Sequence, residues 1–189
     1  MKHLRTAIVV LVFWTIAVGG IYPLVMTGIG AAFFPKKAHG SLVERGGKVV
    51  GSSLLAQDFA SDAYFHPRPS AVKYDGSSSG ASNWGYTSAD LKKAYTQRKS
   101  DWQKAFGPGE PPIEMLYASG SGLDPDISPQ AAEAQAAHVA AARHLTAAQA
   151  AQLLELVRRS EVGPQLGFLG EPRVNVLRLN LAVDDAFPR

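Results

Sequence analysis

The residues that could do chemistry are histidines, serines and carboxylates, and none of them stands in a recognisable catalytic motif. His138 and His144 are six positions apart and lack the glutamate of H-E-x-x-H, so we expect solvated helix histidines rather than zinc ligands. The segment Ser119-Gly-Ser-Gly122 has neither the spacing nor the lysine of a phosphate-binding loop. Ser121 is not in a G-x-S-x-G elbow, because Ser119 stands two positions before it. These motifs therefore give no sign of catalytic residues.

The acidic segment Asp124-Pro-Asp126 begins like a calcium loop but does not continue as one. Pro129 occupies the position that demands glycine, and Gln135 stands where a bidentate glutamate belongs. The chain has no cysteine, which excludes disulfides, thiolate zinc sites, thiol nucleophiles and iron–sulfur clusters. We expect no metal site and no tightly bound cofactor.

His66 and Arg68, in the prolyl segment Tyr64-Phe-His-Pro-Arg-Pro69, leave two interpretations open. In the first, the imidazole and the guanidinium bind a ligand. In the second, which is commoner for such segments, the aromatic rings pack inside the domain and the arginine holds a loop carbonyl or carboxylate.

The excess positive charge sits at one end of the chain. Of the 19 basic residues in a chain of 189, four lie in residues 1–37, where there is no acidic residue; residues 38–189 therefore carry 15 basic against 16 acidic side chains. A nucleic-acid-binding domain needs a basic stripe on its folded body to release counterions. This body is nearly neutral, so we expect no nucleic-acid partner. The four basic residues are Lys2, Arg5, Lys36 and Lys37.

No charged side chain occurs from Thr6 to Phe34. As a helix, these 29 positions would reach about 43 Å, whereas a bilayer core needs about 30 Å. We therefore predict a short basic cytoplasmic tail at residues 1–6, a transmembrane anchor at residues 7–34 and an extracytoplasmic domain at residues 35–189. Pro23 either kinks the helix or marks the end of its regular part.

Two alternatives for this apolar segment are weaker. A buried helix of a soluble protein would show a polar face, which the segment lacks. A cleaved signal peptide would have a shorter apolar core followed by a small-residue cleavage site. The orientation follows from the basic tail, which normally stays in the cytoplasm, although Lys36 and Lys37 beyond the segment weaken that bias.

Small residues recur within the apolar segment at a spacing of four, a pattern that lets another membrane helix approach closely. Glycine is also simply common in membrane helices, so the pattern alone does not decide between the two interpretations. The candidate positions for packing against a partner helix are Thr15, Gly19, Thr27, Gly28, Ala31 and Ala32.

The rest of the chain predicts one α+β domain with a small β-sheet and several helices. Two apolar runs around Gly46-Gly47 predict a β-hairpin, and residues 64–86 and 119–128 predict long loops. Residues 174–183 are mostly apolar, and this run predicts a buried strand.

Capping residues and other helix-start signals predict three helices in the domain. One begins after Thr87 or Ser88, with Thr87 and Asp90 as its cap, and ends at Gly107-Pro108-Gly109. Another begins at Ser128 with Pro129 in its first position and runs to about residue 145. A third opens on the capping box formed by Thr146 and Gln149.

Taken in order, five segments resemble the C subunit family, KdpC, of the bacterial Kdp potassium-transporting ATPase. The resemblance covers nearly the whole chain, with departures at Ala56 and Asp126, where the family pattern has glycine and histidine. The segments are Gly51-Ser-Ser-Leu-Leu-Ala-Gln57, Tyr64-Phe-His-Pro-Arg-Pro-Ser-Ala71, Ser79-Gly-Ala-Ser-Asn83, Ala118-Ser-Gly-Ser-Gly-Leu-Asp-Pro-Asp-Ile-Ser-Pro129 and Leu169-Gly-Glu-Pro-Arg-Val-Asn-Val-Leu177.

The resemblance implies a non-catalytic accessory subunit of an ATP-driven potassium importer in the bacterial inner membrane. Its partners would be a channel-like subunit that selects potassium, a P-type ATPase subunit that hydrolyses ATP, and a very small membrane subunit. The family is also described as a catalytic chaperone that raises the ATP affinity of the ATPase subunit. A domain outside the cytoplasm cannot meet cytosolic ATP, so tuning of potassium entry is the physically easier role.

The residues that the resemblance marks for nucleotide contact or another loop function lie in the first four of these five segments. Two other function classes stay open from the sequence, namely a membrane-anchored extracytoplasmic hydrolase and a freestanding ligand-binding domain. The marked residues are Gln57, His66, Arg68, Ser70, Asn83, Ser119, Ser121 and Asp124.

Overall fold

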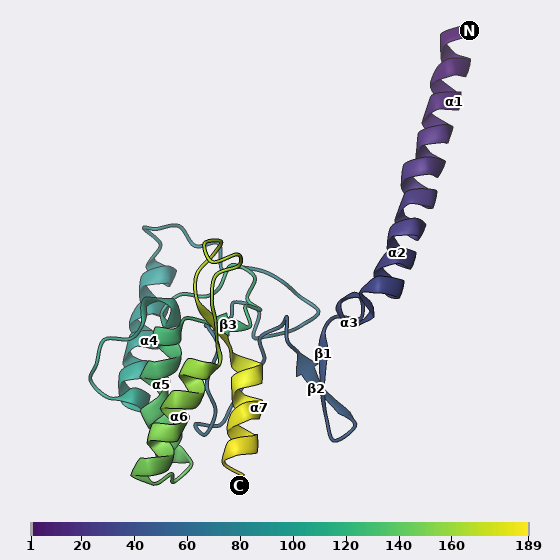
Figure 1. Cartoon of the computed structure of the whole chain (residues 1–189). Coiled ribbons are helices and arrows are strands. Elements are labelled where there is room, and N and C mark those ends of the chain that lie inside the picture. The colour runs from purple at the N-terminus through teal and green to yellow at the C-terminus, as the bar shows by residue number, and fades with distance from the viewer. Residues whose placement is uncertain (1, 189) are drawn as a thin grey trace. The chain divides into compact units, whose positions relative to one another are not determined.

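The computed structural model describes residues 2–188, which form two compact units that divide after Leu42. The first unit is a long helix with a short helical turn behind it (Figure 1). Its elements are α1 (Lys2–Ile16), a π-helical turn η1 (Ala17–Ile21), α2 (Tyr22–Phe33) and α3 (Pro35–Ala38).

The long helix from His3 to Phe33 is long and apolar enough to cross a membrane, and none of it is buried within the chain. The helix continues past Pro23 to Phe33, so Pro23 does not end it. The irregularity lies one turn earlier, where the Tyr22 amide donates to the Ala17 carbonyl five residues back. Proline has no amide hydrogen and its ring crowds the preceding turn, so a wider π turn accommodates it.

The second unit is an α+β domain, which confirms the predicted fold class. Its strands form a two-stranded β1-β2 hairpin and a three-stranded antiparallel sheet in the order β3-β5-β4. Helix α4 packs on α5, α5 on α6, and α6 on α7 (Figure 1). The elements are β1 (Leu42–Arg45), β2 (Lys48–Ser52), α4 (Ala89–Phe106), η2 (Ile113–Met115), β3 (Asp126–Ile127), α5 (Pro129–Ala142), α6 (Ala147–Arg159), β4 (Glu161–Val162), β5 (Arg173–Asn175) and α7 (Val176–Ala186).

Local signals in the sequence set most of these boundaries. The Ser128 cap and the Thr146–Gln149 capping box form as predicted. The hairpin turns at Gly46 and Gly47, whose φ angles of 58° and 75° suit a tight turn. Helix α4 begins after Ser88, one of the two predicted starts, but the predicted cap is wrong by one residue, because the hydroxyl of Ser88, rather than that of Thr87, accepts from the Leu91 amide.

The predicted strand at residues 174–183 is wrong, because the chain leaves the sheet after Asn175 and continues as α7. The Asn175 side chain caps this helix by accepting from the Arg178 amide. Its buried positions then follow the helical repeat of three and four residues, and the polar Asn180 lies among them. The buried residues of α7 are Val176, Leu177, Leu179, Asn180 and Val183.

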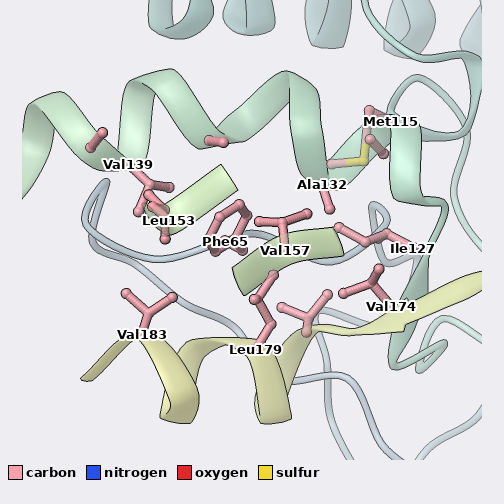
Figure 2. Close-up of a cluster of buried hydrophobic side chains, with 14 of the residues drawn as sticks. Phe65, Met115, Ile127, Ala132, Val139, Leu153, Val157, Val174, Leu179 and Val183 are labelled. Carbon is pink, nitrogen blue, oxygen red and sulfur yellow. The ribbon is translucent and has the colours of Figure 1, made fainter. Parts of the chain in front are cut away.

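The core lies where α5, α6 and α7 meet the sheet. Phe65, from the long loop, is fully buried at its centre, beside Val157 of α6 and Leu179 of α7 (Figure 2). Helix α5 contributes mainly alanines to this core, and their short side chains let the aromatic ring and the neighbouring helices come close. The core thus holds the start of the Tyr64–Tyr86 loop in place.

Candidate functional site

The two loops that carry most of the marked residues are hydrogen-bonded to each other. The Gly80 amide donates to the Ser121 carbonyl at 2.8 Å, and the Ser119 amide donates to the Pro69 carbonyl at 3.0 Å. The Ser79 hydroxyl adds a bond of 3.2 Å to the Ser121 carbonyl. We call this region, residues 68–80 and 119–124, the loop junction.

Gly122 makes the close approach of the two loops possible. Its φ of +67° lies in the left-handed region that favours glycine. A Cβ atom here would lie 2.7 Å from Cγ2 of Val72 and 2.8 Å from the Gly80 carbonyl oxygen. Because the second of these is a backbone atom, no side-chain rotation would relieve the clash, so the loop junction requires glycine at this position.

Arg68 joins the two loops through its side chain. Its guanidinium donates to a carboxylate oxygen of Asp124 at 3.1 Å, across 56 positions of sequence, and both side chains are half-buried. The Tyr74 hydroxyl donates to the Arg68 carbonyl at 3.0 Å. Burial raises the pKa of Tyr74 to about 12, so this donor stays protonated at physiological pH. Of the two interpretations of Arg68, the structure shows the one in which it holds a carboxylate.

The serine hydroxyls of the loop junction shape its turns. The Ser70 hydroxyl accepts from the amides of Val72 and Tyr74, and the Ser121 hydroxyl accepts from the Leu123 amide. Ser119 is 2% exposed, and its hydroxyl has no hydrogen-bond partner among the described residues. Within residues 2–188, no histidine is hydrogen-bonded to these hydroxyls, so none resembles an activated nucleophile.

Gln57 lies next to the loop junction. The amide of the buried Ala56 donates to the Leu123 carbonyl at 2.9 Å, and the Gln57 side chain donates to the Val50 carbonyl at 3.0 Å. A Cβ atom at Gly51 would lie 2.3 Å from the side-chain oxygen of Gln57, so glycine leaves room for this amide. The contact ties the hairpin to the loop junction.

His66 and Asn83 lie apart from the other marked residues. His66 lines a separate pocket of about 310 Å³ with Trp102 and Phe106 of α4. Burial lowers the pKa of His66, which favours its neutral form. Asn83 is exposed and has a φ of +52°. The structure therefore brings only part of the marked set together.

Sequence reasoning missed two buried amides that hold the loop from both sides. Asn180 of α7 accepts from the Phe65 amide at 2.8 Å and donates to the Phe65 carbonyl at 2.9 Å. Gln135 of α5 does the same for His66, at 2.8 and 3.1 Å. Asn180 and Gln135 are 2% and 0% exposed. A polar residue at a buried helical position was the signal that could have revealed them.

Arg143, at the end of α5, was missed as well. Its side chain is 1% exposed and donates to the carbonyls of Ala63 and Phe187 and to the Asp184 carboxylate, at 2.7, 3.2 and 2.6 Å. The Tyr64 ring lies under the guanidinium at 5.1 Å. One buried cation thus ties the loop to the end of α7.

The expectation for the two helix histidines was half right. His144 is exposed but follows α5 rather than lying within it. His138 is half-buried, with its ring 4.6 Å from that of Phe106 and its Nε2 3.7 Å from an oxygen of Asp62. Sequence alone did not show that the long loop and α4 cover this part of α5.

The acidic pair Asp124 and Asp126 is engaged by arginines. Asp126 pairs with Arg173 at 3.1 Å and also accepts from the Asn175 side chain, while Asp124 pairs with Arg68. Within residues 2–188, no three histidine, aspartate or glutamate side chains gather as metal ligands would. The arrangement suits a stiffened surface loop better than a site of bond-making chemistry.

In the long helix, the small residues of α2 form one stripe. At about 100° per residue, Thr27, Gly28, Ala31 and Ala32 share a face, and Gly30 points away from it. Gly19 lies inside the π turn, which interrupts the helical repeat and separates the Thr15–Gly19 pair from this stripe. All six predicted packing positions are exposed in the isolated chain.

Replacing Arg68 with alanine tests what the loop junction is for. We expect the free energy of unfolding to fall by only about 1 kcal/mol, because both partners of the ion pair are partly exposed. Potassium uptake by cells, the activity that the family resemblance implies, should fall by a larger factor than this loss predicts. Equal losses of uptake and stability, with Arg158→Ala as an exposed control, would assign Arg68 to structure alone.

This chain is similar to known proteins over nearly its whole length. Residues 4–185 match the family model described as KdpC, the c chain of K+-transporting ATPase. A potassium-transporting ATPase KdpC subunit of Citrifermentans bemidjiense is 49% identical over 98% of both chains. Those of Rhodospirillum rubrum and Geobacter sulfurreducens are 47% and 46% identical over 100% of this chain, covering 98% and 100% of their own.

These matches confirm the family indicated by the five sequence segments, and they extend through both the long apolar helix and the domain with the loop junction. The chain belongs to the KdpC family, the c chains of K+-transporting ATPases.

Proposed function

We propose that this chain is a non-catalytic subunit that stabilises a potassium-transporting ATPase and tunes the entry of potassium. Its relatives are named as subunits of such ATPases and match it from end to end. The observation that carries the proposal is the helix His3–Phe33, which is apolar, 31 residues long and entirely unburied within the chain. Lipid and partner helices are the surroundings that such a surface requires.

In this proposal, the stripe of small residues on α2 (Thr27, Gly28, Ala31 and Ala32) makes the contact with another subunit. A Cβ atom at Gly28 would meet no atom of this chain within 4 Å, so no contact within the chain requires glycine there. Close approach of a partner helix does require it. The partner in the proposal is the channel-like subunit, with the P-type ATPase subunit and a small membrane subunit completing the assembly.

The orientation in this proposal places the domain outside the cytoplasm, since Lys2 and Arg5 precede the uncharged segment that begins at Thr6. Direct contact with ATP then has no physical route. The geometry also disfavours it, because Arg68 already holds Asp124, whose carboxylate would repel a phosphate. Any increase in the ATP affinity of the ATPase subunit, the catalytic-chaperone role, would act through the assembly.

The two other function classes receive less support. A hydrolase needs an activated nucleophile, and the loop serines of the described chain are engaged in turns or buried. A freestanding ligand-binding domain needs the helix only as a tether, so it would purify alone. Co-purification from detergent therefore separates these classes from a pump subunit.

Replacing Gly28 with leucine tests the helix contact. We expect the yield of chain bound to the other subunits to fall at least about tenfold, because leucine blocks the close approach of the helices. Gly30→Leu is a matched control, since Gly30 lies on another face and a Cβ there also meets no atom within 4 Å. The yield of each subunit is read from affinity-purified complex; equal yields for the two variants would contradict the proposed contact face.

A further inference from the structure

The connection between β4 and β5 carries apolar side chains that nothing in the domain covers. Every residue from 161 to 172 is exposed except Pro164, which is half-buried. Figure 1 shows this connection, in yellow-green, extending beyond the start of α7. Leu166, Phe168 and Leu169 are 83%, 74% and 49% exposed within four positions of sequence. Single exposed apolar residues are ordinary, but three together at one tip mark an interaction surface.

The backbone of this tip is held in shape by its own hydrogen bonds. Gln165 and Leu169 exchange two bonds of 2.8 Å, and the Phe168 amide donates to the Gln165 carbonyl at 3.2 Å. Leu166 has a φ of +54°, a conformation that few residues other than glycine adopt. We call residues 165–169 the apolar tip. A turn that already has a fixed backbone conformation loses less conformational entropy on binding than a flexible one.

The charges around the apolar tip indicate what covers it. Glu161 and Glu171 are exposed on either side. The three described arginines nearest to it in the sequence are already paired, since Arg173 binds Asp126 while Arg158 and Arg159 bind Glu133 and Glu155; Arg178, farther along on α7, is exposed. An apolar tip between two free carboxylates is repelled by an anionic lipid surface. It fits a protein hollow that is apolar inside and basic at its rim.

We propose that the apolar tip docks into such a hollow on another subunit of the potassium-transporting ATPase, an inference that rests on the proposed function. A standard protein–protein interface uses roughly 20–30 residues from each partner, far more than these three side chains. They suffice as an anchor, because the membrane helix already keeps the chain at high local concentration beside its partners. The Phe168 ring, between two leucines, is the residue expected to carry most of the contact.

Photocrosslinking in the intact complex tests whether the apolar tip docks on another subunit. For this test, Phe168 is replaced with p-benzoylphenylalanine, a photoreactive residue of similar shape. Illumination should crosslink the chain to another subunit of the same ATPase, at a site that peptide mass spectrometry places among apolar and basic residues. The same residue in place of Ile113, which is 67% exposed on η2, is the control for unspecific reaction. Crosslinks to lipid, to a second copy of this chain, or no more than at Ile113 would overturn the inference.

A second measurement uses variants. Leu166→Asn combined with Phe168→Asn removes the two most exposed of the three apolar side chains, and asparagine tolerates the left-handed backbone at position 166. We expect the chain to leave detergent-solubilised complex about thirty-fold faster after dilution, the effect of losing a typical anchor. Ile113→Asn should change this rate by no more than about twofold, and the same rate for both variants would overturn the inference. If the wild-type chain fails to co-purify at all, the proposed function fails instead.

Discussion

Replacing Asn180 with leucine should lower the free energy of unfolding of the domain by about 2–6 kcal/mol. Leucine matches asparagine in size but leaves the Phe65 amide and carbonyl without partners in the core. Each unsatisfied buried polar group costs about 1–3 kcal/mol. The expected loss is large because α7 and α5 hold this part of the loop by side-chain amides. Urea titration of the detergent-solubilised chain, followed by circular dichroism, measures it.

Gln135→Met is the companion variant on the other side of the loop, since it leaves the His66 backbone groups without partners. Gln97→Met is the matched control, because Gln97 is exposed on α4 and bonds only to Asp101 four positions on. We expect the control to stay within about 0.5 kcal/mol of wild type. A similar cost at Gln97 and Gln135 would show that the loop is held by packing alone.

Replacing Arg143 with methionine should cost about 3–5 kcal/mol, which is typical when one partner of a buried ion pair is removed. The change leaves the Ala63 and Phe187 carbonyls without this donor and removes a cation from Asp184. Asp184 keeps its bonds to Tyr64 and Arg45, which limits the loss. The same urea titration measures this change in unfolding free energy.

Two further variants show which property of Arg143 matters. Arg143→Lys keeps the charge but cannot make all three bonds, so its cost should lie between those of wild type and Arg143→Met. Arg158→Met breaks an exposed pair with Glu133 and should cost no more than about 1 kcal/mol. Equal costs for Arg143→Met and Arg158→Met would contradict a structural role for the buried guanidinium.

The sequence predicted those parts of the fold that depend on neighbouring residues. The caps at Ser128 and Thr146 and the turn at Gly46-Gly47 form as predicted because each is set within about four positions. The prediction for residues 174–183 was wrong, since a short, mostly apolar run does not distinguish a buried strand from a buried helix. Asn175 at its start is the cap that separates the two in the structure.

The candidate site was predictable in outline only. Segment resemblance identified the loops, but the partners of each side chain come from far along the chain, as with Arg68 and Asp124, which are 56 positions apart. The amides of Gln135 and Asn180 bond to backbone groups 69 and 115 positions away. Pairings of that length depend on the packing of whole helices, which local sequence patterns do not determine.

The central claim is that an uncleaved helix anchors the chain and holds its domain outside the cytoplasm beside the other subunits. Replacing Gly76 with cysteine tests it directly, because the chain has no other cysteine, Gly76 is exposed, and a Cβ there would lie 3.5 Å from Leu55, an ordinary contact. A membrane-impermeant thiol reagent added to intact spheroplasts should label this cysteine in full-length chain that co-purifies with the ATPase. Protection until the membrane is opened, or labelling of only a trimmed and solitary chain, would contradict the account.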